Sequence, residues 1–158
     1  MDISFVTEEG RFNCRVCAIL LDGERLLAMH DERSPYFYLP GGRIKMGERA
    51  EDAVLREVRE ELGIEAKIVR PLWLSQAFFN EDVDGMDFHE LCFYFLLDAS
   101  ETDLLSRGDA FTRQEGRHTH AFEWLPFDRL KDEYLYPLFL KTEIHHLPAV
   151  LTLRTDRE

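Results

Sequence analysis

The chain has 158 residues and a formal net charge of −12, from 19 basic and 31 acidic side chains. Its hydrophobic content of 45% and its length fit a single domain with a hydrophobic core, spanning residues 1–158. The negative charge argues against polymeric nucleic acid and against an anionic membrane surface as partners. It would also repel a small phosphorylated substrate unless a cation neutralised the binding site.

The cysteines and the apolar runs indicate a cytoplasmic protein. Three cysteines, an odd number, argue against a disulfide framework. Cys14 and Cys17 have the spacing of a metal pair, but on a strand they would point to opposite faces, and no second pair completes a zinc site. The acidic first residues and the short apolar runs predict neither a secretory signal nor a membrane segment.

The predicted elements mix strands with two helices. In chain order, we expect strands at 12–21 and 25–30, an extended segment at 36–39, a helix at 48–62, strands at 66–79, 88–97 and 121–125, and a second helix within 137–145. Asp22-Gly23 predicts a hairpin between the first two strands. Residues 80–87 predict a polar turn, residues 99–118 are expected to be irregular, and the charged tail is expected to be mobile. This order predicts an α/β fold with mostly antiparallel strands and helices packed on a curled sheet.

The stretch GGRIKMGERAEDAVLREVREELGI, residues 41–64, predicts a glycine loop that leads into a helix. Glu51 and Asp52 suit the first turn, where the helix dipole favours negative charge. Gly63 followed by the apolar Ile64 is typical of a helix C-terminus. The signals for the start, the body and the end of the helix therefore agree.

Three glutamates near the end of this helix are placed unusually. At about 100° per residue, Glu57 and Glu61 fall on the same side as Ala53, and Glu60 lies beside them. Like charges three or four residues apart repel one another, and partial burial would strengthen that repulsion. A divalent cation with oxygen ligands, such as Mg²⁺, would remove the conflict. The alternative is a solvated acidic face paired with arginines, for example Arg56 with Glu60.

The same stretch resembles the Nudix box, the pattern G-x5-E-x7-R-E-U-x-E-E-x-G-U in which U is aliphatic. Every specified position is matched, by Gly42, Glu48, Arg56, Glu57, Val58, Glu60, Glu61, Gly63 and Ile64. The rest of the chain resembles the family loosely, through its strand order and the stretch FEWLPFDRL at 122–130. The resemblance implies a Nudix fold, an α/β/α sandwich with a curled mixed sheet.

The resemblance also implies an activity. A Nudix hydrolase would use Mg²⁺ or Mn²⁺ to cleave a nucleoside diphosphate linked to another moiety, with water attacking the bridging diphosphate. Glu57, Glu60 and Glu61 would hold the metal together with the carbonyl of Gly41. Arg56 would orient the carboxylates, and Glu57 or Glu60 would accept the proton from water. A homodimer, as many relatives form, is left open.

Four residues outside the helix are further candidates. Glu115, in RQEGRH, resembles a loop glutamate that serves elsewhere in the family as a metal ligand or base, and Glu90 is a second acidic candidate. Arg33 and Arg43 flank the proposed site and are candidates for substrate phosphate contacts. Each of the four has a plain alternative as a solvent-facing charge.

Histidines and aromatic residues add weaker signals. His118 and His120 have metal-pair spacing, but we expect them to be polar loop residues. Aromatic side chains could stack on a nucleotide base, although core packing is their usual role; the candidates are Tyr36, Phe79, Phe88 and Phe111.

Two other classes of function remain open. A non-catalytic nucleotide- or ADP-ribose-sensing module would keep the fold without turnover, but it would not need a complete box. A purely structural acidic domain would gain no stability from divalent metal. Several substrates fit equally well: nucleoside triphosphates, oxidised nucleotides, ADP-ribose, nucleotide sugars and dinucleoside polyphosphates.

Overall fold

The computed structural model describes residues 1–81 and 84–157. The strands are β1 (Ser4–Thr7), β2 (Gly10–Leu20), β3 (Arg25–Asp31), β4 (Gly41–Arg43), β5 (Lys67–Glu81), β6 (Met86–Asp98), β7 (Ala110–Glu115), β8 (His118–Pro126) and β9 (Thr152–Arg157). The helices are α1 (Ala50–Leu62) and α2 (Leu140–Glu143), with short 3-10 helices η1 (Leu104–Arg107) and η2 (Phe127–Asp132).

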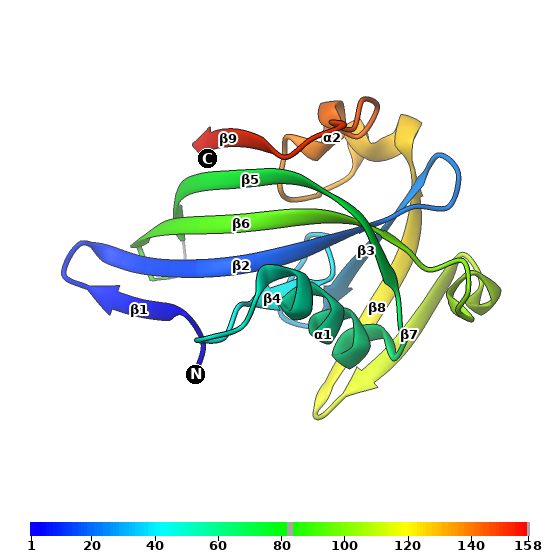
Figure 1. Ribbon diagram of the computed structural model, residues 1–158, viewed down its shortest axis with the longest axis horizontal. Coiled ribbons are helices and arrows are strands. Elements are labelled where there is room, and N and C mark those ends of the chain that lie inside the picture. The colour runs from blue at the N-terminus through cyan, green and yellow to red at the C-terminus, as the bar shows by residue number, and fades with distance from the viewer. Residues whose placement is uncertain (82–83, 158) are drawn as a thin grey trace.

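The strands form two sheets that share the core (Figure 1). The larger sheet has the order β1-β2-β6-β5-β9, and β4 pairs with β2. It is mixed, because β2 and β6 run parallel while β5 and β6 run antiparallel. The smaller sheet has the antiparallel order β3-β8-β7. An α/β fold with a curled mixed sheet is therefore confirmed.

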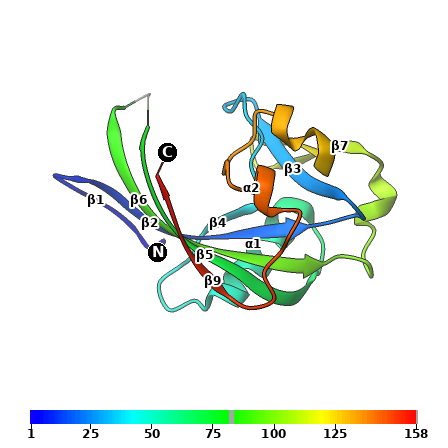
Figure 2. The same cartoon turned by 90° about the horizontal axis from the view of Figure 1, so that it is seen from above.

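Helices lie on both sides of the larger sheet, which gives the predicted layered arrangement. In Figure 1, α1 lies below β2 and α2 lies above β5, and Figure 2 shows the ends of β1, β2 and β6 extending away from the smaller sheet. Alternation along β2 divides its side chains: Val16 and Ala18 join the core cluster beneath α1, and Cys17 and Ile19 join a second cluster with α2 and η2. No helix in the described residues is long and apolar enough to cross a bilayer.

Helix α1 ends where the sequence predicts and begins two residues later than predicted, at Ala50 instead of Glu48. Val54, Val58 and Leu62 are fully buried on one stripe, which supplies most of the stabilisation that a short helix lacks by itself. Gly63 ends the helix with a left-handed φ of 67°, and its N–H donates to the carbonyl of Arg59. This end is therefore fixed in position, along with the glutamates that precede it.

The predicted hairpin between the first two strands forms only at its turn. Asp22 and Arg25 do form a tight turn with two backbone hydrogen bonds, and Leu21 bridges Leu26. Beyond this turn the strands separate into different sheets, because β3 pairs with β8 along its whole length. A local turn signal carries no information about a partner a hundred residues away.

Two segments are more ordered than the sequence predicts. The stretch 99–118, expected to be irregular, contains η1 and strand β7. The charged tail, expected to be mobile, forms β9, which adds to the larger sheet parallel to β5. Strands β7 and β9 are short and polar and bury few side chains of their own. Pairing with an existing sheet edge is therefore what orders them. Within the predicted turn at 80–87, residues 82 and 83 lie outside the described part of the chain.

Candidate active site

The glycine loop and the second half of α1 bring Glu57 and Glu61 together. The backbone N–H of Gly41 donates to Oε1 of Glu61 at 3.0 Å, and the Glu61 side chain is buried. A Cβ atom at Gly42 would lie only 2.5 Å from the Glu57 carboxylate, so glycine is required for this close approach of β4 to the helix. The predicted inward placement is confirmed for these two glutamates.

Glu60 does not share that placement. Its side chain is 45% exposed, and its carboxylate lies 3.4 Å from Nη1 of Arg56. The sequence places Glu60 beside the other two glutamates, at the edge of the packing face, but its side chain is exposed and turned towards Arg56. The reason is geometric, since a residue three positions after Glu57 is rotated by about 60° around the helix, away from the side that Glu61 shares.

Arg56 connects the loop to the carboxylates. Its Nε and Nη2 donate to the two carboxylate oxygens of Glu48 at 2.7 and 3.0 Å, and Nη1 donates to Glu57 at 2.8 Å. Nη2 also donates to the carbonyl of Arg43 at 3.0 Å. The hydrogen bonds from Arg56 are the main reason that the pKa of Glu48 is lowered to about 2. One guanidinium thus fixes both the loop and one oxygen of Glu57.

The electrostatics of the inward pair are unfavourable without a cation. Burial raises the pKa of Glu57, and the charges of Glu60 and Glu115 add to that effect, although Arg56 opposes it. Burial raises the pKa of Glu61 well above its ordinary value, and the negative charge of Glu57 raises it further. The hydrogen bond from Gly41 offsets only part of this. The protein therefore holds two carboxylates where a second negative charge is costly.

Strands β7 and β8 bring a third acid to the site. Glu115 is the last residue of β7, and its charge contributes to the raised pKa of both Glu57 and Glu61. Nε2 of the buried His120 lies 3.0 Å from Oε1 of Glu115. Nδ1 of His120 has no hydrogen-bond partner among the described residues. The prediction that His118 and His120 lie in a loop is wrong, because both belong to β8.

The other predicted residues all have protein partners. Nη2 of Arg33 donates to the buried Asp31 at 3.0 Å, while the Arg33 side chain stays 59% exposed. Nη1 of Arg43 lies 3.8 Å from Oδ2 of Asp2, and the Arg43 side chain is 40% exposed. Glu90, on β6, accepts a hydrogen bond from Nδ2 of Asn13 at 2.8 Å. Arg33 and Arg43 therefore keep exposed ends that a ligand can reach, whereas Glu90 is engaged within the sheet.

Tyrosines border the same region. Tyr36 lies in a cluster with Tyr38, Tyr134 and Tyr136, with ring centroids 5.2 to 6.3 Å from that of Tyr36. Burial raises the pKa of Tyr38, and the charge of Glu61 contributes to that rise, so the cluster adjoins the carboxylates. The three phenylalanines considered for base stacking are each stacked on another phenylalanine ring. Among the candidates, Tyr36 is thus the one placed near the site.

The donors at this site fit a hard divalent cation. Glu61 is a buried carboxylate that accepts a hydrogen bond from a neutral backbone N–H, and oxygen is the ligand atom that Mg²⁺ prefers. In the described part of the chain, however, no three acidic, cysteine or histidine side chains converge into a ready-made metal centre. Glu57 and Glu61 supply two carboxylates, and Glu60 would join them after turning away from Arg56. Two carboxylates with phosphate and water ligands are typical of Mg²⁺ sites.

Fold and site together define an α/β protein with an acidic helix and a glycine loop at the edge of a mixed sheet. The chain belongs to the Nudix family, since the NUDIX domain model matches residues 12–143. It is 31% identical over 101 residues to an ADP-ribose pyrophosphatase of Methanocaldococcus jannaschii. That alignment covers 59% of this chain and 57% of the archaeal protein, so the chain spans little more than half of that relative.

Solved structures share the fold over a larger part of the chain. The MutT protein of Bacillus halodurans has a TM-score of 0.59 at 16% identity, covering 90% of this chain and 89% of that one. An ADP-ribose pyrophosphatase of Streptococcus suis has a TM-score of 0.53 at 17% identity, covering 91% and 98%. At these identities the likeness concerns the fold alone.

Proposed function

We propose that this protein is a Mg²⁺- or Mn²⁺-dependent pyrophosphohydrolase that cleaves a nucleoside diphosphate linked to another moiety. The observation that carries the proposal is the inward pair Glu57 and Glu61, held against a glycine loop. Membership of the Nudix family supports hydrolysis of a phosphorus anhydride. The archaeal relative, named an ADP-ribose pyrophosphatase, makes ADP-ribose the first substrate to test.

The acidic residues and the glycine loop would hold the cation. Glu57 and Glu61 would bind it through their carboxylates, with Glu60 and the carbonyl of Gly41 as further ligands. When bound, Mg²⁺ or Mn²⁺ would supply Lewis-acid polarisation of the phosphate oxygens. Arg56 would keep one oxygen of Glu57 fixed, so that the other oxygen is free for the metal.

Glu115 is the residue we propose as the proton acceptor for the attacking water. The sequence favours Glu57 or Glu60 for this role, but both of these carboxylates contact Arg56. Glu115 instead has one oxygen at 3.0 Å from the buried His120, and its side chain is 40% exposed. A carboxylate oriented by a histidine and open to solvent can reach a water molecule beside the inward pair.

A substrate panel tests the proposal. With Mg²⁺ or Mn²⁺ present, we expect the protein to release a nucleoside monophosphate from at least one of ADP-ribose, a nucleotide sugar, an oxidised nucleoside triphosphate and a dinucleoside polyphosphate. EDTA should abolish release. Chromatography of the products separates a hydrolase from a sensing module, which would bind a panel member without cleaving it. Absence of cleavage of every member, with both metals, would count against the enzyme.

Replacing Gly42 by alanine should damage the site without unfolding the protein. The added Cβ would meet the movable Glu57 carboxylate at 2.5 Å, so the carboxylate must shift. We expect kcat/KM to fall at least tenfold, because a misplacement of about 1 Å can lower the rate by about 100-fold. The melting temperature should change little.

Gly41→Ala is the matched control for this substitution. There the added Cβ would lie 2.2 Å from the backbone carbonyl oxygen of Val16, which cannot move aside as a side chain does. We expect this variant to lose melting temperature as well as activity. If Gly42→Ala kept full activity, the position of Glu57 would not matter to the reaction.

A further inference from the structure

One face of the larger sheet carries a row of polar side chains beyond the apolar core. In β2, Asn13 and Arg15 precede Cys17 on the same face, by the alternation of the strand. Cys17 packs in the second core cluster, so Arg15 stands where that apolar packing ends. Its register partner in β6 is Cys92, and the partner of Cys92 in β5 is the buried Ser75.

Arg15 is a partly buried cation that forms no hydrogen bond or ion pair with the described residues, although, against the opposing effect of burial, the nearby charges of Cys17 and Glu90 raise the pKa of its guanidinium. Its Nε is shielded from solvent and has no hydrogen-bond partner. The polar neighbours are already engaged, since Asn13 binds Glu90 at 2.8 Å and Ser75 donates to Asp156 at 2.7 Å. Of the two thiols beside Arg15, Cys92 has a pKa raised well above its ordinary value by burial, whereas the hydrogen bond from Cys92 and the charge of Arg15 lower the pKa of Cys17.

A partly buried guanidinium without a hydrogen-bond partner lowers the stability of the folded protein. Each buried polar group without a partner costs about 1–3 kcal/mol, and a charged group costs more. Other arginines of this chain show what a structural role looks like: Arg70 on β5 donates from Nε to the carbonyl of Pro148 at 3.0 Å. Arg15 has the same partial burial but lacks a partner of this kind, so an anion from outside the chain would satisfy it.

The candidate metal site lies next to Arg15. Gly41, whose N–H holds Glu61, is the register partner of Cys17, and Arg43 is the register partner of Arg15 itself. Two residues along a strand correspond to about 7 Å, and adjacent strands lie about 5 Å apart. An arginine side chain and a diphosphate group together can span this separation. Helix α1 packs on the other face of β2, but Glu57 and Glu61 both interact electrostatically with Cys17. Cys17 shares the face of Arg15, so a substrate held at the carboxylates can extend to Arg15.

We propose that Arg15 binds the substrate phosphate that does not contact the carboxylate-held cation. The ligand is an anionic phosphate oxygen of a nucleoside diphosphate derivative, accepted by the planar guanidinium. This inference rests on the proposed function for the identity of the whole substrate. It adds a specific cation on β2, outside the Nudix box, that favours diphosphate-bridged substrates over compounds with a single phosphate.

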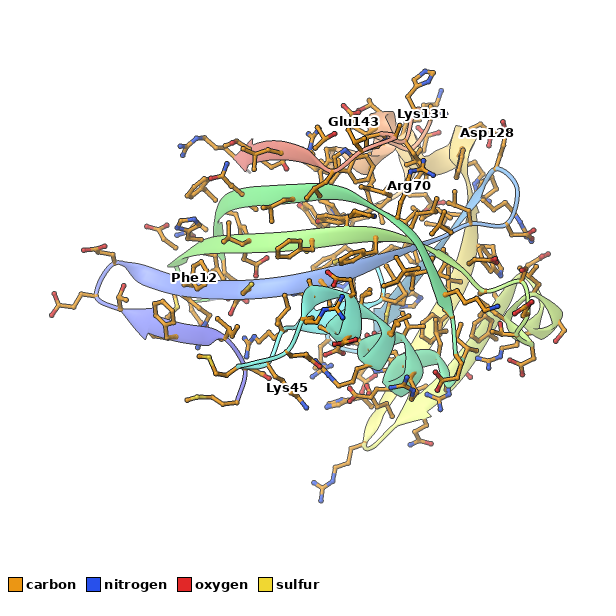
Figure 3. All side chains as sticks on the ribbon, viewed as in Figure 1. Phe12, Lys45, Arg70, Asp128, Lys131 and Glu143 are labelled. Atoms are coloured by element: carbon orange, nitrogen blue, oxygen red, sulfur yellow. The ribbon has the colours of Figure 1, made fainter. Side chains whose placement is uncertain are left out.

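The test compares Arg15→Gln and Arg15→Lys with the wild type and with Arg70→Gln. Arg70 is a partly buried arginine near the start of β5, labelled in Figure 3. For a cleaved panel member, Arg15→Gln should raise KM at least tenfold and leave kcat within about threefold, as expected when ground-state and transition-state binding are lost equally. Arg15→Lys should restore part of the affinity. Arg70→Gln should leave KM unchanged.

A binding measurement separates this inference from the hydrolase proposal. Inorganic pyrophosphate is titrated, with and without Mg²⁺, while the arginine Nε–H signals are followed by NMR. The Arg15 signal, assigned by its absence in Arg15→Gln, should shift in the wild type. If no panel member were cleaved, the hydrolase proposal would fail, but the NMR signal of Arg15 would still report whether Arg15 binds pyrophosphate. An unmoved Arg15 signal in both conditions, or an unchanged KM in Arg15→Gln, would overturn the role of Arg15.

Discussion

Glu61→Gln should lose activity by about 100- to 1,000-fold while the metal-free protein becomes more stable. Glutamine retains an oxygen that can accept the N–H of Gly41, so the fold should be preserved. It removes the charge that would bind the cation, and metal-assisted charge neutralisation is worth several kcal/mol in phosphoryl chemistry. It also removes the repulsion with Glu57, which raises the pKa of Glu61 in the wild type.

The sign of the stability effect follows from the direction of the pKa shifts. Glu57 and Glu61 have folded-state pKa values above the ordinary value of 4.5. The folded protein therefore binds more protons than the unfolded chain, and stability is lost as the pH rises above 4.5 and through the folded pKa values. Melting in EDTA at pH 5 and pH 8 should show a larger loss for the wild type than for Glu61→Gln.

Mg²⁺ should reverse the order of stability, so that the wild type becomes more stable than Glu61→Gln. A ligand present at 100 times its Kd stabilises the folded state by about 2.7 kcal/mol, and only the wild type should gain this fully. Glu65→Gln is the control, because Glu65 is exposed and pairs with Arg59 away from the inward pair. If Glu61→Gln were active at the wild-type rate, or were destabilised in EDTA at pH 8, the assignment of Glu61 as a metal ligand would be wrong.

Arg56→Met should have the second large effect, on stability and activity together. The Arg56 side chain is 17% exposed, and its partners Glu48 and Glu57 are 16% and 15% exposed. Removing one member of a buried ion pair typically costs about 3–5 kcal/mol, because the remaining charges stay buried and unpaired. Activity should also fall, since Glu57 would lose the donor that fixes one of its oxygens.

Urea unfolding of Arg56→Met and Arg56→Lys at several pH values measures this effect. The pKa of Glu48 is lowered to about 2, so its contribution is present above the ordinary value of 4.5 and is lost as the pH falls towards 2. The difference between wild type and Arg56→Met should therefore shrink in acid. Arg56→Lys should recover only part of the stability, because lysine cannot bind Glu48 through two parallel donors. A difference that did not depend on pH would contradict this account of Arg56.

The local parts of this structure could be predicted from the sequence. The boundaries of α1 depend on signals within the helix, namely the stripe of Val54, Val58 and Leu62 and the glycine after it. The inward placement of Glu57 and Glu61 follows from the same periodicity. The Nudix box added the family and a set of roles for these residues.

The parts that depend on long-range pairing could not be predicted. Glu115 and His120 meet because β7 pairs with β8, and the polar sequence around them reads as a loop. Alternating exposure along β7 places Phe111, Arg113 and Glu115 on one side, which is the one local signal for this strand. Arg15 needed the structure as well, since only its neighbours show that its guanidinium lacks a partner.

The central claim is that the carboxylates of Glu57 and Glu61 are tolerated because they bind a divalent cation. Anomalous diffraction from a crystal grown with millimolar Mn²⁺ tests it most directly. We expect one strong peak within coordination distance of both carboxylates, and no peak there in Glu61→Gln. An anomalous difference map with no peak at these residues in the wild type, or with a peak that persists unchanged in Glu61→Gln, would contradict the claim.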